Sequence, residues 1–588
     1  MVTTTEPAPS AVPIPTVVDA ESDDPVTGAA TADVASIELL GETIAYAGDG
    51  ASVSGSTITI VSAGTYSVSG VLRDGQIIVD TPDEKTVALI LNGVSITSST
   101  SAPIYIINAE KVVITLADGT ESTVTDGDAY ALTDAESGEP NAAIFSNDDL
   151  TIGGNGALVV NANYNHGIAS DDDLKITGGT INVSSVNDAL KGKDSIVIQD
   201  GTVMLNAGGD GMHASNTDDA GKGNVSIEGG TLVITAALDG IQAETQLLVS
   251  GGDITVSSGG GSVNASQRAD WGTWGQGNSA VEPDAAISAK GLKAGVDLTI
   301  ENGTITIDSS DDAIHSNDRM TVNGGTIVIA SGDDGLHADA TLLINGGELA
   351  ITKSYEGIES AAITINDGAI RVVSSDDGIN TAGGADGSAL GGRPGRNTFS
   401  DSGDYSLTIT GGYVAVDALG DGIDSNGPID MSDGVVLING PTGNMNGALD
   451  YMGSFTITGG LLVAAGSSGM AQAPSESSTQ HSVIVNFPSV MAAGTLVHME
   501  AAVGQGVLTF APVKDYQSIV VSSPELANGE TYAIYVGGSS TGVVADSLYT
   551  GGSYAAGTRV TDLTISSIVT GVGNYGGFMR GRPGGGRP

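Results

Sequence analysis

Acidic side chains recur in this sequence at a nearly constant spacing. Small-apolar pairs stand 22, 22, 22 and 21 residues apart, at Gly291-Leu292, Ala313-Ile314, Gly335-Leu336, Gly357-Ile358 and Gly378-Ile379. Two residues before each apolar anchor lies a first column, mostly of carboxylates: His166, Asp188, Asp210, Asp239, Lys290, Asp312, Asp334, Glu356, Asp377, Asp421. One residue after the anchor lies a second column: Ala169, Lys191, His213, Gln242, Lys293, His315, His337, Glu359, Asn380, Asp424, Asp450. Such residues could bind a cation or transfer a proton.

Pairs of consecutive acids favour the interpretation that the columns bind a cation. At Asp311-Asp312, Asp333-Asp334 and Asp376-Asp377 a second carboxylate precedes the column. If the repeats stack about 4.8 Å apart, neighbouring carboxylates repel by roughly 3 kcal/mol at an effective dielectric of about 20. Calcium takes roughly six to eight oxygens and can bridge them, whereas turn formation by Asp explains one acid per turn only. We therefore expect calcium to bind among Asp311, Asp312, Asp333, Asp334, Glu356, Asp376 and Asp377.

Three lysines, Lys191, Lys290 and Lys293, stand at column positions that acids or histidines otherwise hold. A lysine beside a bound cation could remove the proton alpha to a uronate carboxylate while the cation stabilises the enolate. The alternative is that these lysines only balance the negative charge of the neighbouring acids. The histidines of the second column indicate a polar surface stripe rather than a transition-metal site, which needs a compact set of ligands.

The repeats themselves predict the fold. Each holds three short β-prone stretches separated by Gly, Asn, Asp or Ser, without room for a helix. Leucine-rich repeats need a Leu/Asn ladder that is absent, and calcium-binding nonapeptide rolls repeat every nine residues. The pattern therefore predicts an all-β protein built as a right-handed single-stranded parallel β-helix with about 22 residues per coil, followed by a small C-terminal β domain.

Changes in the pattern suggest the domain boundaries. We expect a disordered Pro/Thr-rich linker over 1–33, a cap with irregular first coils over 34–140, the β-helix over 141–480, the C-terminal β domain over 481–570 and a Gly/Arg/Pro tail over 571–588. Two insertions interrupt the helix, near 258–289 and 383–404. The first contains Trp271 and Trp274, whose rings could pack against sugars or clamp the insertion.

Composition narrows the function. The net charge of −50 argues against nonspecific binding of nucleic acid. The chain has no cysteine, so neither disulfides nor thiol chemistry are available. No signal peptide or membrane span is visible, but the Pro/Thr-rich leader favours an exported, extracellular or cell-wall-associated protein over a cytoplasmic one.

The motifs resemble a known family. SAKGLKAG (288–295), SSDDAIHSND (309–318), SGDDGLHAD (331–339), KSYEGIES (353–360), SSDDGINTAGG (374–384), GDGIDSNG (420–427) and SGMAQAPS (468–475) are similar to stretches of secreted bacterial carbohydrate-binding proteins. Those proteins have a calcium-bearing right-handed β-helix like that of pectate-lyase-type polysaccharide lyases. The resemblance, from about 35 to 570, implies binding of cellulose-like or acidic, pectin-like polysaccharides. In the lyases a lysine base lies beside aspartate-bound calcium, and no single lysine here matches it securely.

Three functions follow as expectations. The first is a calcium-binding, polysaccharide-binding protein, with Trp271 and Trp274 as candidate sugar contacts. The second is a calcium-dependent pectate lyase acting by β-elimination, with Lys191, Lys290 or Lys293 as base. The third is a structural spacer at the cell surface. The sequence leaves the oligomeric state and the identity of the polysaccharide open.

Overall fold

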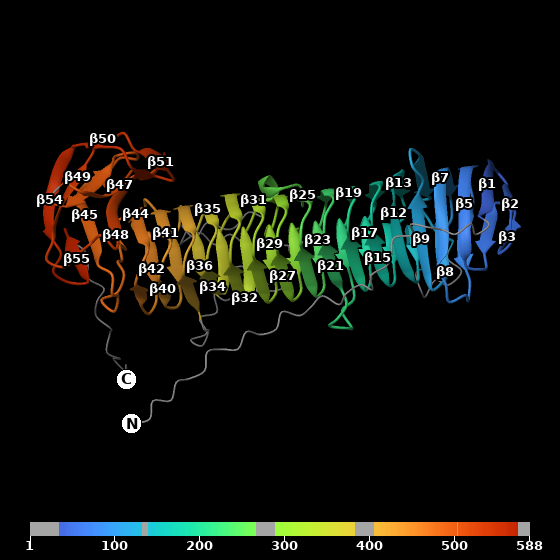
Figure 1. Cartoon of the computed structure of the whole chain (residues 1–588), viewed down its shortest axis with the longest axis horizontal. Coiled ribbons are helices and arrows are strands. Elements are labelled where there is room, and N and C mark those ends of the chain that lie inside the picture. The colour runs from blue at the N-terminus through green and yellow to red at the C-terminus, as the bar shows by residue number, and fades with distance from the viewer. Residues whose placement is uncertain (1–33, 132–138, 266–287, 383–404, 502–503, 574–588) are drawn as a thin grey trace, which may run out of the picture.

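The computed structural model describes residues 34–131, 139–265, 288–382, 405–501 and 504–573. Within these ranges the protein is all-β, and most strands join one large, mainly parallel sheet that runs the length of an elongated molecule (Figure 1). A single 3-10 turn, η1 (Ser262–Asn264), is the one helical element in the described ranges. The expected all-β class is therefore confirmed. The linker over 1–33 and both tryptophans lie outside the described residues.

From β8 to β44 each strand pairs in parallel with the equivalent strand of the next repeat, in most repeats three places further along, so these strands form three series. The anchor series, which carries the apolar anchors, is β8 (Ile104–Asn108), β11 (Ala142–Ser146), β14 (His166–Ser170), β17 (Leu190–Gly192), β20 (Met212–Ala214), β23 (Ile241–Ala243), β26 (Leu292–Ala294), β29 (Ile314–Ser316), β32 (Leu336–Ile344), β34 (Ile358–Ile365), β36 (Ile379–Thr381), β39 (Ile423–Ser425) and β42 (Leu449–Tyr451).

The middle series is β9 (Lys111–Leu116), β12 (Asp149–Gly154), β15 (Asp173–Ile176), β18 (Ser195–Ile198), β21 (Asn224–Ile227), β24 (Gln246–Val249), β27 (Asp297–Ile300), β30 (Arg319–Val322), the second halves of β32 and β34, β37 (Ser406–Ile409), β40 (Ile429–Met431) and β43 (Phe455–Ile457). The outer series is β10 (Glu121–Asp126), β13 (Ala157–Ala162), β16 (Thr180–Ser185), β19 (Thr202–Ala207), β22 (Thr231–Ala236), β25 (Asp253–Ser258), β28 (Thr304–Ser309), β31 (Thr326–Ser331), β33 (Glu348–Lys353), β35 (Ala369–Ser374), β38 (Tyr413–Ala418), β41 (Val435–Asn439) and β44 (Leu461–Gly466).

The N-terminal strands begin the same sheet with a less regular pattern. They are β1 (Ala35–Gly41), β2 (Ile44–Ala47), β3 (Ala51–Ser54), β4 (Thr57–Ile60), β5 (Gly64–Leu72), β6 (Gln76–Asp80) and β7 (Val87–Ser98). The pairs β1–β2 and β3–β4 are antiparallel, whereas β5 pairs in parallel with both β1 and β7. Antiparallel hairpins at the first repeat give this end of the sheet a pairing that the later repeats lack.

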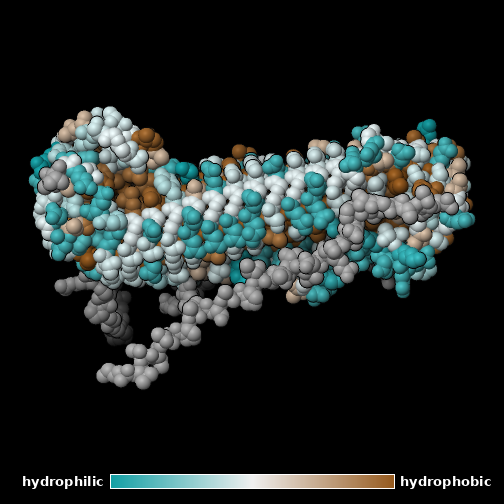
Figure 2. Space-filling model, in the orientation of Figure 1, coloured by the Kyte–Doolittle hydropathy of each residue, from teal (hydrophilic) through white to brown (hydrophobic). Residues whose placement is uncertain are grey.

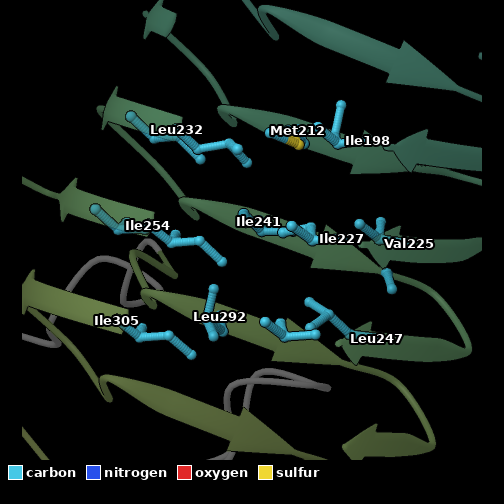
Figure 3. Close-up of a cluster of buried hydrophobic side chains, with 14 of the residues drawn as sticks. Ile198, Met212, Val225, Ile227, Leu232, Ile241, Leu247, Ile254, Leu292 and Ile305 are labelled. Atoms are coloured by element: carbon cyan, nitrogen blue, oxygen red, sulfur yellow. The ribbon is translucent and has the colours of Figure 1, made fainter. Parts of the chain in front are cut away.

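One apolar core runs through the repeats. In Figure 3, Met212, Ile241 and Leu292 of the anchor series lie near side chains of the other two series, such as Ile227 and Leu232. These five side chains are at most 1% exposed. Alternation along each strand places every second residue inside, which is why β-branched and leucine residues recur at these positions.

Two kinds of small residue keep the repeat at a constant length. At the predicted turns the second glycine has a positive φ, 93° at both Gly325 and Gly347, a conformation that costs other residues energy. The residue before each anchor is Gly or Ala because the next repeat is close. A Cβ on Gly422 would lie 2.5 Å from the carbonyl oxygen of Ala448 and 2.2 Å from Ile438.

The C-terminal strands form a second core against the last repeats. They are β45 (Ser482–Met491), β46 (Val497–Ala501), β47 (Gly506–Phe510), β48 (Tyr516–Ser522), β49 (Thr531–Val536), β50 (Ser539–Ser540), β51 (Val543–Ala545), β52 (Leu548–Thr550), β53 (Tyr554–Ala555), β54 (Thr558–Thr564) and β55 (Val569–Val572). Strands β45, β48 and β55 join the large sheet through β44, while β46, β47, β49, β51, β52 and β54 form a six-stranded sheet. The second core includes Leu437 and Val463 of the outer series. Figure 2 shows hydrophobic surface in the hollow beside these strands.

The hairpin β51–β52 reaches back to the repeats. Its turn residues, Asp546 and Ser547, have φ values of 44° and 74° and are the two non-glycine residues with positive φ in the described chain. The Asp546 carboxylate accepts hydrogen bonds from Arg371 Nε at 3.1 and 3.2 Å, and Ser547 Oγ lies 3.3 Å from Asn439 Nδ2. The strained turn is therefore held by side chains of β35 and β41.

Candidate metal and polysaccharide site

The strand pairing confirms the register of the second column. Lys293 pairs with His315, His315 with His337, Asn380 with Asp424, and Asp424 with Asp450. The columns thus run along the anchor series, and each acid of the first column lies beside a residue of the second.

Each first-column aspartate uses one carboxylate oxygen to accept a backbone amide of the next repeat. Asp188 Oδ1 accepts the amide N–H of Asp210 at 3.1 Å, and Asp210 Oδ1 that of Asp239 at 2.9 Å. The same bond joins Asp312 to the amide of Asp334 at 3.0 Å. Sequence reasoning missed this role, which explains why an acid recurs once per repeat without any cation. The second carboxylate oxygen is left to face the neighbouring column.

In the middle repeats that second oxygen faces a basic group of the protein. Lys290 is 0% exposed, and its Nζ lies 2.6 Å from Asp312 Oδ2 and 3.3 Å from Asp311 Oδ2. His315 Nδ1 lies 2.9 Å from the same Asp312 oxygen. Burial alone would raise the pKa of Asp312. Lys290 and His315 lower it by more than burial raises it, so the pKa is well below the usual value. The Asp311–Asp312–Asp333 group therefore already contains a positive charge.

Two histidines in the second column are held between carboxylates. His337 Nδ1 lies 3.0 Å from Asp334 Oδ2, and its Nε2 lies 3.2 Å from Asp339 Oδ1. Burial lowers the pKa of His337, but the bonds to these two acids raise it well above 6.5 overall. A ring with an acid at each nitrogen is stabilised as the imidazolium.

His213 has the same arrangement in an earlier repeat. Its Nδ1 lies 3.6 Å from carboxylate oxygens of both Asp188 and Asp210, and its Nε2 lies 3.2 Å from Glu244 Oε1. Burial lowers the pKa of His213, and the bonds to Asp188 and Glu244 raise it to about 9. Lys191, His213, Lys293, His315 and His337 thus give the repeats up to β32 a row of basic groups beside the acids.

From β34 onward the columns contain no basic residue, and every member except Asn380 is an acid. Asp377, Asp421 and Asp424 each offer a carboxylate oxygen within 4.8 Å of the others. Burial, followed by repulsion from Asp376, Asp421 and Asp424, raises the pKa of Asp377 to about 8. Burial also raises the pKa of Asp421 to about 7 and that of Asp424 to about 6. No basic side chain of the described residues forms an ion pair with these three acids.

Two further acids in this stretch, Glu356 and Glu359, also have raised pKa values. Burial, followed by repulsion from Glu359, raises the pKa of Glu356 well above 4.5, and burial with repulsion from Asp334 does the same for Glu359. Asn380 donates from Nδ2 to Glu356 Oε2 at 2.8 Å, and its own Oδ1 is buried without a hydrogen-bond partner in the described chain. This set of oxygens suits a hard cation.

The seven predicted metal ligands are therefore divided between three surroundings. Asp311, Asp312 and Asp333 form one group, with Lys290 beside it; Asp334 forms another with His337 and Glu359. Asp377 groups instead with Asp421 and Asp424. Asp376 lies close enough to raise the pKa of Asp377, and Asp377 is among the acids that raise the pKa of buried Glu356. Asp421 and Asp424 were absent from the predicted ligands, although the column spacing places them in line with the others.

The three candidate lysines also differ in how far their side chains are exposed to solvent. Lys290 is fully buried, and Lys293 Nζ lies 3.1 Å from Asp239 Oδ2 with 16% of its side chain exposed. Lys191 is half-buried on β17 and lies near Asp171, where burial raises the pKa of the carboxyl and Lys193 and Lys191 offset part of that rise. A fully buried ammonium cannot reach a polymer, which leaves the two partly exposed lysines, Lys191 and Lys293, as the accessible candidate bases. Trp271 and Trp274 fall outside the described residues.

Comparisons with known proteins agree with the expected carbohydrate-binding resemblance. A curated "Carbohydrate-binding domain-containing protein" from Acetivibrio thermocellus is 52% identical over 137 residues, which is 23% of this chain and 48% of that protein. The chain thus spans about half the length of the curated relative. A solved polysaccharide lyase-like protein from C. thermocellum, a gadolinium derivative, is 45% identical over 39% of this chain and 92% of its own, with a TM-score of 0.38. Residues 54–335 match the model of a family described as "Carbohydrate-binding domain-containing protein".

Proposed function

We propose that this protein binds polysaccharide outside the cell or at the cell wall, along the repeats that carry the two columns. The observation that carries the proposal is the family match over 54–335, which spans the strands from the end of β3 to the start of β32. Outward side chains of successive outer-series strands lie in register, as in Thr202, Thr231 and Asp253. A long surface of regularly spaced polar groups suits an extended polymer. No helix of the described chain is long and apolar enough to cross a membrane.

We also propose that the three series wind as a right-handed single-stranded parallel β-helix. Parallel pairing of each strand with the equivalent strand of the next repeat supports this arrangement, as does the single core that the three series share. Parallel crossover connections are right-handed in nearly all proteins. Handedness is testable on an experimental map at a resolution that shows the chain direction.

The proposed cation is calcium, and the acidic end of the columns fits it best. Asp376, Asp377, Asp421 and Asp424, with Asn380 Oδ1 nearby in the column, would supply oxygen ligands. Calcium would supply positive charge that offsets their mutual repulsion. Asp311, Asp312 and Asp333 fit less well, since the ammonium of Lys290 already lies against two of them.

Retention on insoluble glycans tests the function. The purified full chain is mixed with cellulose and with cross-linked polygalacturonate, in calcium and in chelator, and the bound fraction is measured. We expect retention on at least one of them. Loss of retention in chelator alone would indicate that calcium organises the binding surface. Absence from every pellet would leave a cell-surface spacer as the better function.

A calcium-dependent lyase is the second candidate, because Lys191 is partly exposed beside the acidic columns. β-elimination on pectate forms an unsaturated uronate that absorbs ultraviolet light. If absorbance rises in calcium and the rise is lost in Lys191→Ala while binding persists, the lyase replaces simple binding. Lys293→Ala is the matched control, since Lys293 is held on Asp239.

A further inference from the structure

The six-stranded sheet of the C-terminal strands has one face on the second core and an outer face turned away from it. Along β46, Val497 and Met499 belong to that core, so alternation places His498 on the outer face. His498 pairs with Tyr535 of β49, and Tyr535 pairs with Arg559 of β54. The outer face therefore carries an imidazole, a phenol ring and a guanidinium in one row across three strands.

Three rings on this face are held in a fixed arrangement. The Tyr554 ring stacks on the His498 ring with centroids 3.9 Å apart, and it meets the Tyr535 ring at 60° with centroids 6.1 Å apart. Tyr554 Oη donates to the Gly537 carbonyl oxygen at 2.7 Å, and His498 Nδ1 lies 2.7 Å from Thr509 Oγ1. Both tyrosines remain partly exposed. Because the rings are already ordered, a ligand that contacts them loses little free energy to their ordering.

Groups that bind hydroxyls surround the Tyr535 ring. Glu500 of β46 pairs with Ala533 of β49, which in turn pairs with Asp562 of β54, so two acids flank a small residue in the next row. Arg559 forms an ion pair with Asp562, and its Cζ lies 6.0 Å from the Tyr535 ring centroid. The Arg559 and Asp562 side chains are 55% and 52% exposed, and that of Glu500 is 27% exposed. Aromatic rings edged by a few polar groups suit a ligand with an apolar face and a polar rim.

We propose that this outer face binds a sugar of an uncharged polysaccharide, packed against the rings of Tyr535 and Tyr554. Glu500, Arg559 and Asp562 form hydrogen bonds with its hydroxyls. The inference rests on the proposed binding of polysaccharide and adds a second site to it. The site lies outside 54–335, the residues that match the carbohydrate-binding family, and is therefore distinct from the surface proposed on the repeats.

The charges of the site select an uncharged sugar. Its two carboxylates and one guanidinium leave a net negative charge. His498, whose Nε2 lies 3.5 Å from Glu500 Oε2, adds no charge near neutral pH, because burial lowers the pKa of its imidazole below 6.5. A uronate would be repelled by the acids. The hydroxyls of a neutral sugar can accept from Arg559 and donate to the carboxylates, so a cellulose-type chain fits better than a pectin-type chain.

Amide hydrogen exchange of the full chain with cellohexaose locates the site. The sugar should slow exchange in 535–541 and 554–562, the residues that carry and support the two tyrosine rings. Tyr535→Ala should weaken the affinity read from these segments by about tenfold, the order expected for one lost ring contact. Tyr535→Phe should bind like the wild type, since the ring remains. Asp562→Ala, at an exposed position, leaves every ring in place and should weaken binding by a smaller factor.

Tyr46→Ala is the matched control, because Tyr46 is a partly exposed tyrosine of β2, at the opposite end of the molecule (Figure 1). It should bind cellohexaose like the wild type. Slower exchange in the repeats alone would uphold the proposed function and overturn the second site. Slower exchange in 535–541 and 554–562 alone would support the second site and count against binding along the repeats. Equal affinity of Tyr535→Ala and wild type, or slowing of these segments by an oligogalacturonate instead of cellohexaose, would overturn the inference.

Discussion

A first-column aspartate serves the fold and the site with different oxygens. Asp377 Oδ1 accepts the amide of Asp421 at 2.6 Å, while its carboxylate is repelled by Asp376, Asp421 and Asp424. An asparagine can keep the first interaction, since its Oδ1 also accepts, and removes the second. Substitution by asparagine therefore separates the structural role of the residue from its charge.

Asp377→Asn should stabilise the metal-free protein and weaken its response to calcium. Relief of repulsion between neighbouring carboxylates is worth roughly 3 kcal/mol or less, so the melting temperature in chelator should rise. The calcium-induced increase should shrink because one ligand charge is lost. Asp433→Asn is the control, since Asp433 is an exposed turn acid that also accepts an amide, from Gly434 at 2.8 Å. A lower Tm in chelator would contradict repulsion at Asp377.

His213 makes the stability depend on pH in the alkaline range. Its folded pKa of about 9 lies above the ordinary 6.5, so its contribution is fully present below 6.5 and is lost as the pH rises through about 9. The difference corresponds to roughly 3 kcal/mol. Burial and neighbouring acids also raise the pKa of Asp210 to about 7 and that of Asp377 to about 8. These acids also make the stability fall with rising pH, so the difference in slope between wild type and a His213 variant reports His213.

His213→Gln should therefore lose less stability than the wild type between pH 7 and 9. Thermal melts at half-unit pH steps measure this. His481→Gln, which changes a surface histidine that bonds to the Ser567 carbonyl oxygen, should keep the wild-type slope. Parallel curves for His213→Gln and wild type would mean that the ring is neutral in the folded state.

At the scale of elements, the hairpin β51–β52 depends on the repeats for its geometry. Non-glycine residues with positive φ cost of order 1 kcal/mol or more and persist where their surroundings hold them. Arg371 provides much of that support, since Nη2 lies 3.0 Å from Asp546 Oδ2 and the guanidinium stacks on Tyr413 at 5.6 Å. The pair is partly exposed, so its contribution to the free energy of unfolding is modest.

Arg371→Met should release the hairpin without unfolding the repeats. We expect amide hydrogen exchange in 543–550 to accelerate by about tenfold, which corresponds to a loss of about 1.4 kcal/mol, while exchange in β28 and β31 stays unchanged. Arg319→Met removes a comparably exposed Arg–Asp pair, with Asp297, in the middle series. Faster exchange in 543–550 of that control would show a general loosening instead.

The sequence predicted the repeat and its columns because the side-chain period of a strand and the constant turn length are local properties. The pairing of His315 with His337 follows directly from the 22-residue spacing. The spacing did not predict which charged side chains form ion pairs with one another. Lys290 could have faced Asp239 or Asp312, and only the direction of its stem decides that. The contact of Asp546 with Arg371 spans 175 residues and had no local signal.

At the scale of the whole molecule, the net charge of −50 opposes compaction along the full length of the chain. Salt screens the exposed part of this repulsion, because the Debye length falls from about 30 Å at 0.01 M to about 8 Å at 0.15 M. Buried acids such as Asp377 are screened much less. Two effects of added cations are therefore separable, a general one from ionic strength and a specific one from binding at the acidic end of the columns.

Melting in different salts at equal ionic strength measures both effects. We expect sodium chloride to raise the Tm of the chelator-treated protein gradually between 0.01 and 0.15 M, with no saturation at low concentration. Calcium chloride should add a further increase that starts near its dissociation constant and grows with the logarithm of its concentration, reaching about 2.7 kcal/mol at a hundredfold excess. Magnesium should add less, because it demands near-octahedral geometry and keeps its waters. Asp377→Asn should lose much of the calcium-specific part and retain the sodium effect. If the calcium and sodium curves coincide once ionic strength is matched, the acidic end of the columns binds no ion, and its carboxylates are held by protonation alone.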